Sequence, residues 1–194
     1  MRKNYMYKKK LLFGVTGSIG ASNVPTYLAY LAQEYEINLI MTENSQKFLV
    51  SNACLPYVEY VYTNMNDHSR VKIPHANLPR DADLFLVLPA TANFLFKIAN
   101  GAADDLLTLA ILNYGGPVCV APNMNPLMWN SHSVQRNVKQ LKEDGFHFLN
   151  VSAHSIEASS GNILFSEASL PQPQELIDSL NKVYTCAKNS ELIL

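Results

Sequence analysis

The chain has 194 residues, 48% of them apolar and 16% charged, and a net charge of −1, which is the balance of one globular domain and excludes nucleic acid as an expected partner. Three scattered cysteines, Cys54, Cys119 and Cys186, lack any CxxC spacing, which argues against a disulfide framework and against a metal site. No apolar run approaches the roughly 20 residues of a membrane helix, so we expect a cytoplasmic protein without a membrane span.

Apolar runs alternate with helical patterns along the first part of the chain. Strands are predicted at 11–15 (LLFGV) and 37–42 (INLIMT), with helices from about 22 to 35 and from about 44. In the first helix, apolar residues recur at spacings of three and four, so one face is expected to pack on a sheet. Such alternation is typical of βαβ units and a parallel sheet.

The centre of the chain repeats this pattern. The apolar runs at 83–90 (DLFLVLPA) and 117–123 (PVCVAPN) lack polar alternation, as inner parallel strands do, and a helical pattern over 90–112 separates them. A helix from about 133 to 144, a strand at 146–151 and a closing helix that begins at Pro173 follow. These elements predict one α/β domain over residues 1–194, with a doubly wound parallel sheet.

One segment interrupts the alternation. Residues 152–170 (SAHSIEASSGNILFSEASL) are rich in serine and alanine around Gly161. This composition suits a flap or hairpin that stands off the sheet, and a plain connecting loop fits it equally well.

In an open α/β sheet the ligand lies beyond the carboxyl ends of the strands, so the residues that follow each strand are the first candidates. After the first strand comes GVTGSIGAS, whose glycines have the spacing GxxGxxG and whose Thr16 and Ser18 hydroxyls suit a phosphate. A tight turn with a capping serine explains the same residues. After the second strand, Thr42 stands where a nicotinamide dinucleotide site would favour an acid, which mildly favours a mononucleotide.

The central strand ends in a corner of small and polar residues, Pro89-Ala90-Thr91-Ala92-Asn93, in which Thr91 and Asn93 can form hydrogen bonds. A capped helix start is the alternative interpretation. His75, expected on a loop that leads into the sheet, is the best general-base candidate because imidazole titrates near pH ~6.5; a surface histidine is the alternative. The absence of G-x-S-x-G and of a P-loop motif argues against a serine hydrolase and a P-loop kinase.

Four features together resemble one family. They are a strand that leads into GVTGSIGA, a histidine eleven residues before LVLPATAN, the stretch KIANGAADDLLTLAIL, and PNMNPLMW at 122–129. The chain thereby resembles the homo-oligomeric flavin-containing cysteine decarboxylases over roughly residues 10 to 150, with P-x-M-N-x-x-M-W as the most specific motif. That family includes phosphopantothenoylcysteine decarboxylases, related halotolerance proteins and the peptidyl-cysteine decarboxylases that modify lantibiotic precursors.

The resemblance implies a Rossmann-like flavoprotein, a homotrimer or homododecamer, and FMN as cofactor with FAD as the alternative. It implies that His75 is the active-site histidine and that Asn123 and Asn125 bind the substrate. Asn125 would hold a carboxylate, within reach of His75, and Met128 would form an apolar wall beside the substrate. The residues implied to contact the flavin are Gly17, Ser18, Thr42, Phe48, Pro89, Ala90, Thr91, Ala92, Asn93 and Met124.

The branches of this family differ in one residue type. Phosphopantothenoylcysteine decarboxylases carry a cysteine in the flap, which helps to return electrons to the product, whereas the flap here reads SSGNILFS. The resemblance therefore implies oxidative decarboxylation of the carboxy-terminal cysteine of a lantibiotic-type precursor peptide, which gives an aminoenethiol. His75 would assist deprotonation while hydride passes to the flavin, and residues 152–170 would close over the peptide as a clamp. The alternatives are phosphopantothenoylcysteine decarboxylation and a non-catalytic flavin-binding regulatory subunit.

Overall fold

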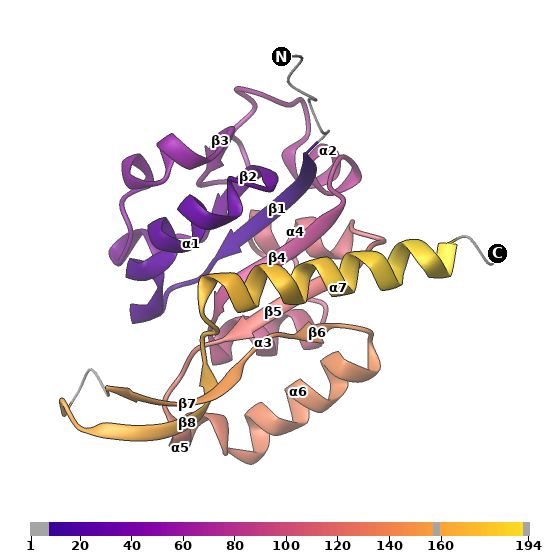
Figure 1. Cartoon of the computed structure of the whole chain (residues 1–194). Helices are drawn as coiled ribbons and strands as arrows, with labels where there is room; N and C mark the ends of the chain where they lie inside the picture. Colours follow the sequence, from indigo (N-terminus) through magenta and orange to yellow (C-terminus); the bar gives the residue numbers. More distant parts are fainter. Residues whose placement is uncertain (1–7, 157–159, 192–194) are drawn as a thin grey trace, which may run out of the picture.

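A parallel sheet of six strands organises the chain in the computed structural model, which describes residues 8–156 and 160–191 (Figure 1). Its strand order is β3-β2-β1-β4-β5-β6, so the order reverses between β1 and β4. This is the order of doubly wound dinucleotide-binding folds, and the predicted fold class is confirmed. The strands are β1 (Lys9–Val15), β2 (Tyr35–Met41), β3 (Tyr60–Tyr62), β4 (Leu84–Ala90), β5 (Val118–Pro122) and β6 (His147–Phe148).

Helices cover both faces of the sheet because its inner strands are apolar on both sides. Along β1, Leu11 and Phe13 point into one core and Leu12 into the other. The first core is closed by α1 (Val24–Leu31) and by α7 (Pro173–Glu191), which lie on one side of the sheet (Figure 1). The second core is closed by α2 (Pro74–Arg80), α3 (Ala92–Ala99), α4 (Leu106–Leu112) and α6 (His132–Glu143).

The segment 152–170 forms a hairpin rather than a plain loop. Strands β7 (Val151–Ile156) and β8 (Ile163–Ser169) pair antiparallel and stand off the main sheet, while residues 157–159 lie outside the described part of the chain (Figure 1). Short helix α5 (Pro126–Trp129) packs against β8, and Trp129 Nε1 donates to Glu167 Oε2 at 3.3 Å. The hairpin is thus fastened at its base and exposed towards its tip.

Several element boundaries differ from the prediction. The helix expected from about 22 to 35 is a 3-10 turn, η1 (Ile19–Asn23), followed by α1, and Tyr35 already begins β2, where its hydroxyl donates to Asn181 of α7. The helix expected from about 44 is a series of 3-10 turns, η2 (Ser45–Lys47), η3 (Ser51–Ala53) and η4 (Leu55–Tyr57). The strand expected at 146–151 shortens to β6.

The helical pattern over 90–112 is interrupted once. Gly101 adopts a φ of 66°, a left-handed conformation that ends α3 without strain because glycine has no Cβ. Asp105 then starts α4 with a capping box, in which its side chain accepts from the Thr108 N–H at 2.8 Å. The break places Lys97, Asp104 and Asp105 together near the carboxyl ends of the strands. Within the described ranges, no helix is both long enough and apolar enough to cross a bilayer.

Candidate active site

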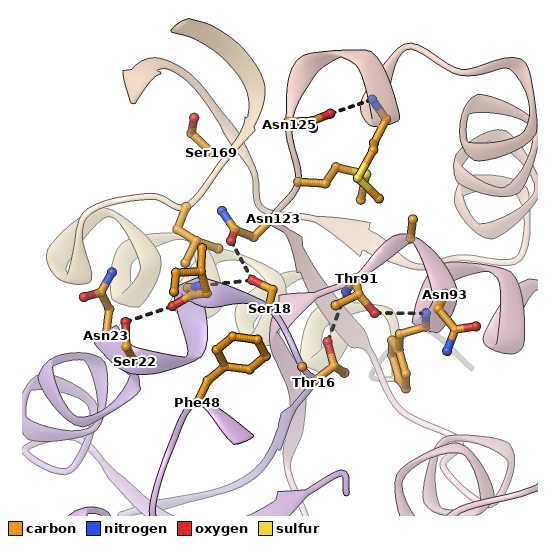
Figure 2. Close-up of a pocket in the computed structure, with 18 of the residues that line it drawn as sticks. Thr16, Ser18, Ser22, Asn23, Phe48, Thr91, Asn93, Asn123, Asn125 and Ser169 are labelled. Carbon is orange, nitrogen blue, oxygen red and sulfur yellow. Dashed lines mark hydrogen bonds between the residues drawn. The ribbon is translucent and has the colours of Figure 1, made fainter. Parts of the chain in front are cut away.

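A large cavity lies at the carboxyl ends of β1, β4 and β5, where the strand order reverses (Figure 2). Its walls are the glycine loop after β1, the corner after β4, the segment PNMNPLMW after β5 and the β7–β8 hairpin. Its volume of about 1150 Å³ exceeds the range of about 300–1,000 Å³ that is common for small-molecule sites. The cavity therefore has room for a cofactor together with the end of a second ligand.

Thr16 fastens the first two of these walls to each other. Its side chain is only 2% exposed, and its Oγ1 donates to the Pro89 carbonyl at 2.7 Å while it accepts from the Thr91 N–H at 3.1 Å. Thr91 in turn caps α3 by accepting from the Phe94 N–H (Figure 2). The sequence marked Thr16 only as one hydroxyl near glycines, and its role in joining two corners comes from the structure.

The glycine loop also touches the loop after β2. A Cβ on Gly17 would lie 2.6 Å from the Asn44 Cβ and 2.8 Å from the Asn44 backbone, which is too close for any other residue. Thr42 adds a bond from its Oγ1 to the Val15 carbonyl at 3.2 Å. Backbone from two strands therefore converges here, beside the half-exposed ring of Phe48.

Two asparagines form the floor of the cavity, and protein donors occupy both of their side-chain oxygens. Asn125 Oδ1 accepts from the Met128 N–H at 2.9 Å and so caps α5, and Asn123 Oδ1 accepts from the Ser18 hydroxyl at 2.7 Å (Figure 2). What the two side chains can still offer is their amide N–H groups. The floor is therefore suited to ligands that carry hydrogen-bond acceptors, such as a carboxylate, a phosphate or an amide carbonyl.

Most of the residues predicted from the sequence meet at this cavity. The ones that line it are Gly17, Ser18, Thr42, Phe48, Thr91, Ala92, Asn93, Asn123, Met124, Asn125 and Met128. Pro89 and Ala90 do not line it and are buried in β4 beneath it. Their contribution is to hold the corner from below, since the Pro89 carbonyl receives the Thr16 hydroxyl.

His75 lies on a helix, so the expectation that it sits on a loop is wrong, and its expected reach to PNMNPLMW stays a prediction. It is a partly buried residue in the first turn of α2, a helix that packs on α4, and it is not among the described residues that line the cavity. Helix α2 carries the chain back towards the amino end of the sheet, where the Asp83 N–H donates to the Lys10 carbonyl. His75 therefore does not contribute to the described lining of the cavity in its own chain.

No lysine or arginine among the described lining residues is free of an acidic partner. Lys97 is the one lysine or arginine among the described residues that line it, and its Nζ lies 2.7 Å from Asp104 and 3.4 Å from Asp105. The hydrogen bond to Asp104 raises the pKa of Lys97 and lowers that of Asp104. Because Glu43 also lines the cavity, its wall has an excess of negative charge. The sequence pattern did not single out this cluster.

The cavity also lacks a thiol. None of the three cysteines, all of which the structure describes, lines it. Burial raises the pKa of the Cys54 thiol to about 11 and that of the Cys119 thiol to about 12, so both stay protonated inside the protein. Cys186 lies on α7.

A parallel sheet in this order, with a cavity at its switch point, defines a Rossmann-like nucleotide-binding protein. Comparison with known proteins narrows the class. The chain belongs to the flavoprotein family, whose model matches residues 2–184. It is 35% identical over 138 residues to mersacidin decarboxylase from a Bacillus species, covering 71% of each chain, and 34% identical over 145 residues to a phosphopantothenoylcysteine decarboxylase from Arabidopsis thaliana, covering 71% of this chain and 69% of the relative.

Solved structures agree with this assignment. The FMN-dependent cysteine decarboxylase SpaF superposes with a TM-score of 0.75 at 32% identity, covering 93% of this chain and 97% of SpaF. A variant of the peptidyl-cysteine decarboxylase EpiD, complexed with the substrate peptide DSYTC, superposes with a TM-score of 0.81 at 28% identity, covering 90% and 99% of the two chains. The protein is thus a flavin-dependent cysteine decarboxylase with FMN as its cofactor. The cavity fits that cofactor in its volume, in the close backbone approach at Gly17 and in its outward amide donors.

Proposed function

We propose that the protein catalyses the oxidative decarboxylation of the carboxy-terminal cysteine of a lantibiotic-type precursor peptide in the cytoplasm, giving an aminoenethiol. The observation that carries this proposal is the absence of a thiol from the described lining of the cavity. A redox-neutral decarboxylase must give hydride and a proton back to the product, and a flap cysteine serves that step in phosphopantothenoylcysteine decarboxylases. Residues 152–170 contain no cysteine, so the product is expected to leave in its oxidised form.

The charge of the cavity supports a peptide over phosphopantothenoylcysteine. A phosphorylated substrate brings a second phosphate in addition to that of FMN, and Lys97 is already paired with Asp104 and Asp105. The remaining acid, Glu43, would repel such a group. An uncharged peptide segment meets no such penalty, and the EpiD variant with its bound peptide is a structural relative whose substrate is a peptide.

Each part of the cavity has a proposed task. FMN would be held by Gly17, Ser18, Thr42, Phe48, Thr91, Ala92, Asn93 and Met124, above Pro89 and Ala90, and when bound it supplies the two-electron oxidation of the cysteine side chain. Asn125 binds the substrate carboxylate through its amide N–H groups, because its oxygen caps α5. A neutral donor orients the carboxylate without over-stabilising the charge that must leave as CO2. Met128 and the hairpin shield the peptide from water.

His75 acts in this proposal from a second copy of the chain. It does not line the cavity of its own chain, and the predicted homotrimer or homododecamer offers a route by which α2 of one subunit meets the cavity of another. His75 would then take the proton that leaves the cysteine thiol. A non-catalytic regulatory role is disfavoured because both His75 and Asn125 are present.

The direct test is incubation of the purified, flavin-loaded protein in air with a peptide that ends in cysteine. Mass spectrometry should show the loss of CO2 and two hydrogen atoms, and phosphopantothenoylcysteine should not be consumed under the same conditions. Loss of CO2 alone, or preferential use of phosphopantothenoylcysteine, would contradict the oxidative peptide reaction.

The placement of His75 has its own test. His75→Asn and Asn125→Asp should each be inactive and still yellow, and Asn125→Asp keeps the α5 cap because aspartate caps as well as asparagine does. Co-refolded mixtures of the two variants should regain activity, since some interfaces then combine an intact His75 with an intact Asn125. Mixtures that stay inactive would place both residues in the cavity of one chain.

A further inference from the structure

The side-chain oxygen of Asn123 lies against the glycine loop. Its Oδ1 accepts from the Ser18 hydroxyl at 2.7 Å, and a Cβ on Gly20 would lie 2.6 Å from the same oxygen. The Ser18 hydroxyl itself accepts from the Gly20 N–H at 3.1 Å, so its single proton is committed to Asn123. The hydrogen bond from Ser18 and the close approach of Gly20 therefore hold the Asn123 oxygen on the side of the glycine loop.

The free end of that amide faces the cavity. Asn123 is partly buried, no described residue accepts from its Nδ2, and Figure 2 shows this nitrogen on the side away from Ser18. Among the described residues, no fully buried side-chain nitrogen or oxygen lacks a hydrogen-bond partner. Since the Asn123 Nδ2 has no partner, it is not fully buried and a ligand can reach it. The loop beside it allows close approach, because Gly17 and Gly20 carry no side chains there.

The phosphate of FMN is an anion that needs cations or N–H donors, and the cavity offers few cations for it. The only lysine or arginine among the described lining residues, Lys97, is held by two carboxylates, so neutral N–H groups are the donors that this chain leaves for the phosphate. Hydrogen bonds from N–H groups to an anion are about twice as strong as those to a neutral acceptor. A side-chain amide at the edge of a glycine-rich loop is well suited to this task.

We propose that Asn123 is a ligand of the flavin phosphate, and that Ser18 acts on the cofactor by orienting Asn123. The family resemblance implies a substrate role for Asn123, whereas its contacts lie with the loop that adjoins the cofactor. The inference depends on FMN as cofactor and not on the identity of the substrate. A flavin titration therefore tests it even if the proposed peptide reaction fails.

The experiment compares two flavins that differ only in the phosphate. Flavin-free protein is titrated with FMN and with riboflavin, and binding is followed by flavin fluorescence. Asn123→Asp is isosteric and keeps the acceptor for Ser18, yet it replaces the N–H donors by a negative charge. It should weaken FMN binding at least about tenfold relative to riboflavin. Asn123→Ala and Ser18→Ala should lower the FMN affinity in the same selective way, and their effects should not add.

Asn125→Asp is the matched control, since it places the same charge two residues away in the same floor and keeps its own cap. Its ratio of FMN to riboflavin affinity should stay within about threefold of the wild-type value. Equal losses for FMN and riboflavin in Asn123→Asp would show that Asn123 contacts another part of the flavin and would overturn the proposal. Unchanged flavin affinity with weakened peptide binding would overturn it in favour of the substrate role.

Discussion

The glycine-loop side of the cavity and its hairpin side are built in opposite ways. On the glycine-loop side, Thr16 is 2% exposed, Ala90 is fully buried, and hydrogen bonds join the corners after β1 and β4. On the hairpin, Ile156 is 73%, Ile163 is 70% and Phe165 is 53% exposed. The difference teaches that the glycine-loop side is a buried framework formed before any ligand arrives, whereas the hairpin, the proposed substrate side, is an exposed apolar surface. Segments with few buried contacts are also the ones that open most easily.

Thr16→Val should destabilise the glycine-loop side of the cavity and weaken flavin binding there. It should have the largest effect of the variants that we consider. Valine has nearly the same shape and cannot accept from the buried Thr91 N–H or donate to the Pro89 carbonyl. Leaving a buried N–H without a partner costs about 2 kcal/mol of unfolding free energy, which urea denaturation would measure. The purified variant should also lose its yellow colour. Thr16→Ser keeps the hydroxyl and should keep both properties, and a stable yellow Thr16→Val would disprove the role of this bond.

Phe165→Ala should affect peptide binding at the hairpin and leave the glycine-loop side of the cavity unchanged. The Phe165 ring is half-exposed and packs edge-on against His154, which lines the cavity. The KM for the peptide should rise several-fold, while stability changes by less than about 0.5 kcal/mol and the flavin stays bound. Phe96→Ala is the matched control, because Phe96 is also 53% exposed and lies on α3 outside the described lining. A similar rise in KM in both variants would contradict a specific role for the hairpin.

Asp104→Asn should give the smallest effect, although it also lies at the cavity. Lys97 lowers the pKa of Asp104 from its ordinary value of 3.8, so this pair stabilises the fold above that value and stops doing so as the pH falls through the lowered pKa. The Asp104 side chain is 57% exposed, so the loss at neutral pH should be less than about 1 kcal/mol. Thermal unfolding should show this difference at pH 7 and none in strong acid. A difference that grows on acidification would contradict the pairing.

The inner strands were predictable because parallel strands that are buried on both faces have uninterrupted apolar sequences. LLFGV falls within β1, and DLFLVLPA contains β4, as expected. The alternation with helices predicted a doubly wound parallel sheet, whereas the order of its strands came from the structure. The segment after Thr42 was not predictable in this way. Its residues fit a helix by spacing, yet Val50 and Leu55 remain exposed and the chain forms only 3-10 turns there. Helical spacing alone does not reveal whether a face finds a partner.

The candidate site was predictable to the extent that it follows strand ends. Residues after β1, β2, β4 and β5 meet because parallel strands end at one edge, which is how Ser18, Thr91 and Asn125 come to line one cavity. His75 precedes a strand, and its position depends on how α2 packs on α4, for which the local sequence has no signal. The bond between Ser18 and Asn123 joins residues 105 positions apart in the chain and required coordinates.

The central claim is that a peptidyl cysteine is oxidised in this cavity and that the flavin does not return the two electrons to the product. A titration without oxygen tests this claim most directly. The oxidised holoenzyme is mixed with one equivalent of a peptide that ends in cysteine, and flavin absorbance and peptide mass are recorded together. The account predicts that the yellow colour bleaches in proportion to peptide added and that the product lacks CO2 and two hydrogen atoms. A product that lacks only CO2, with the flavin still oxidised, would contradict it.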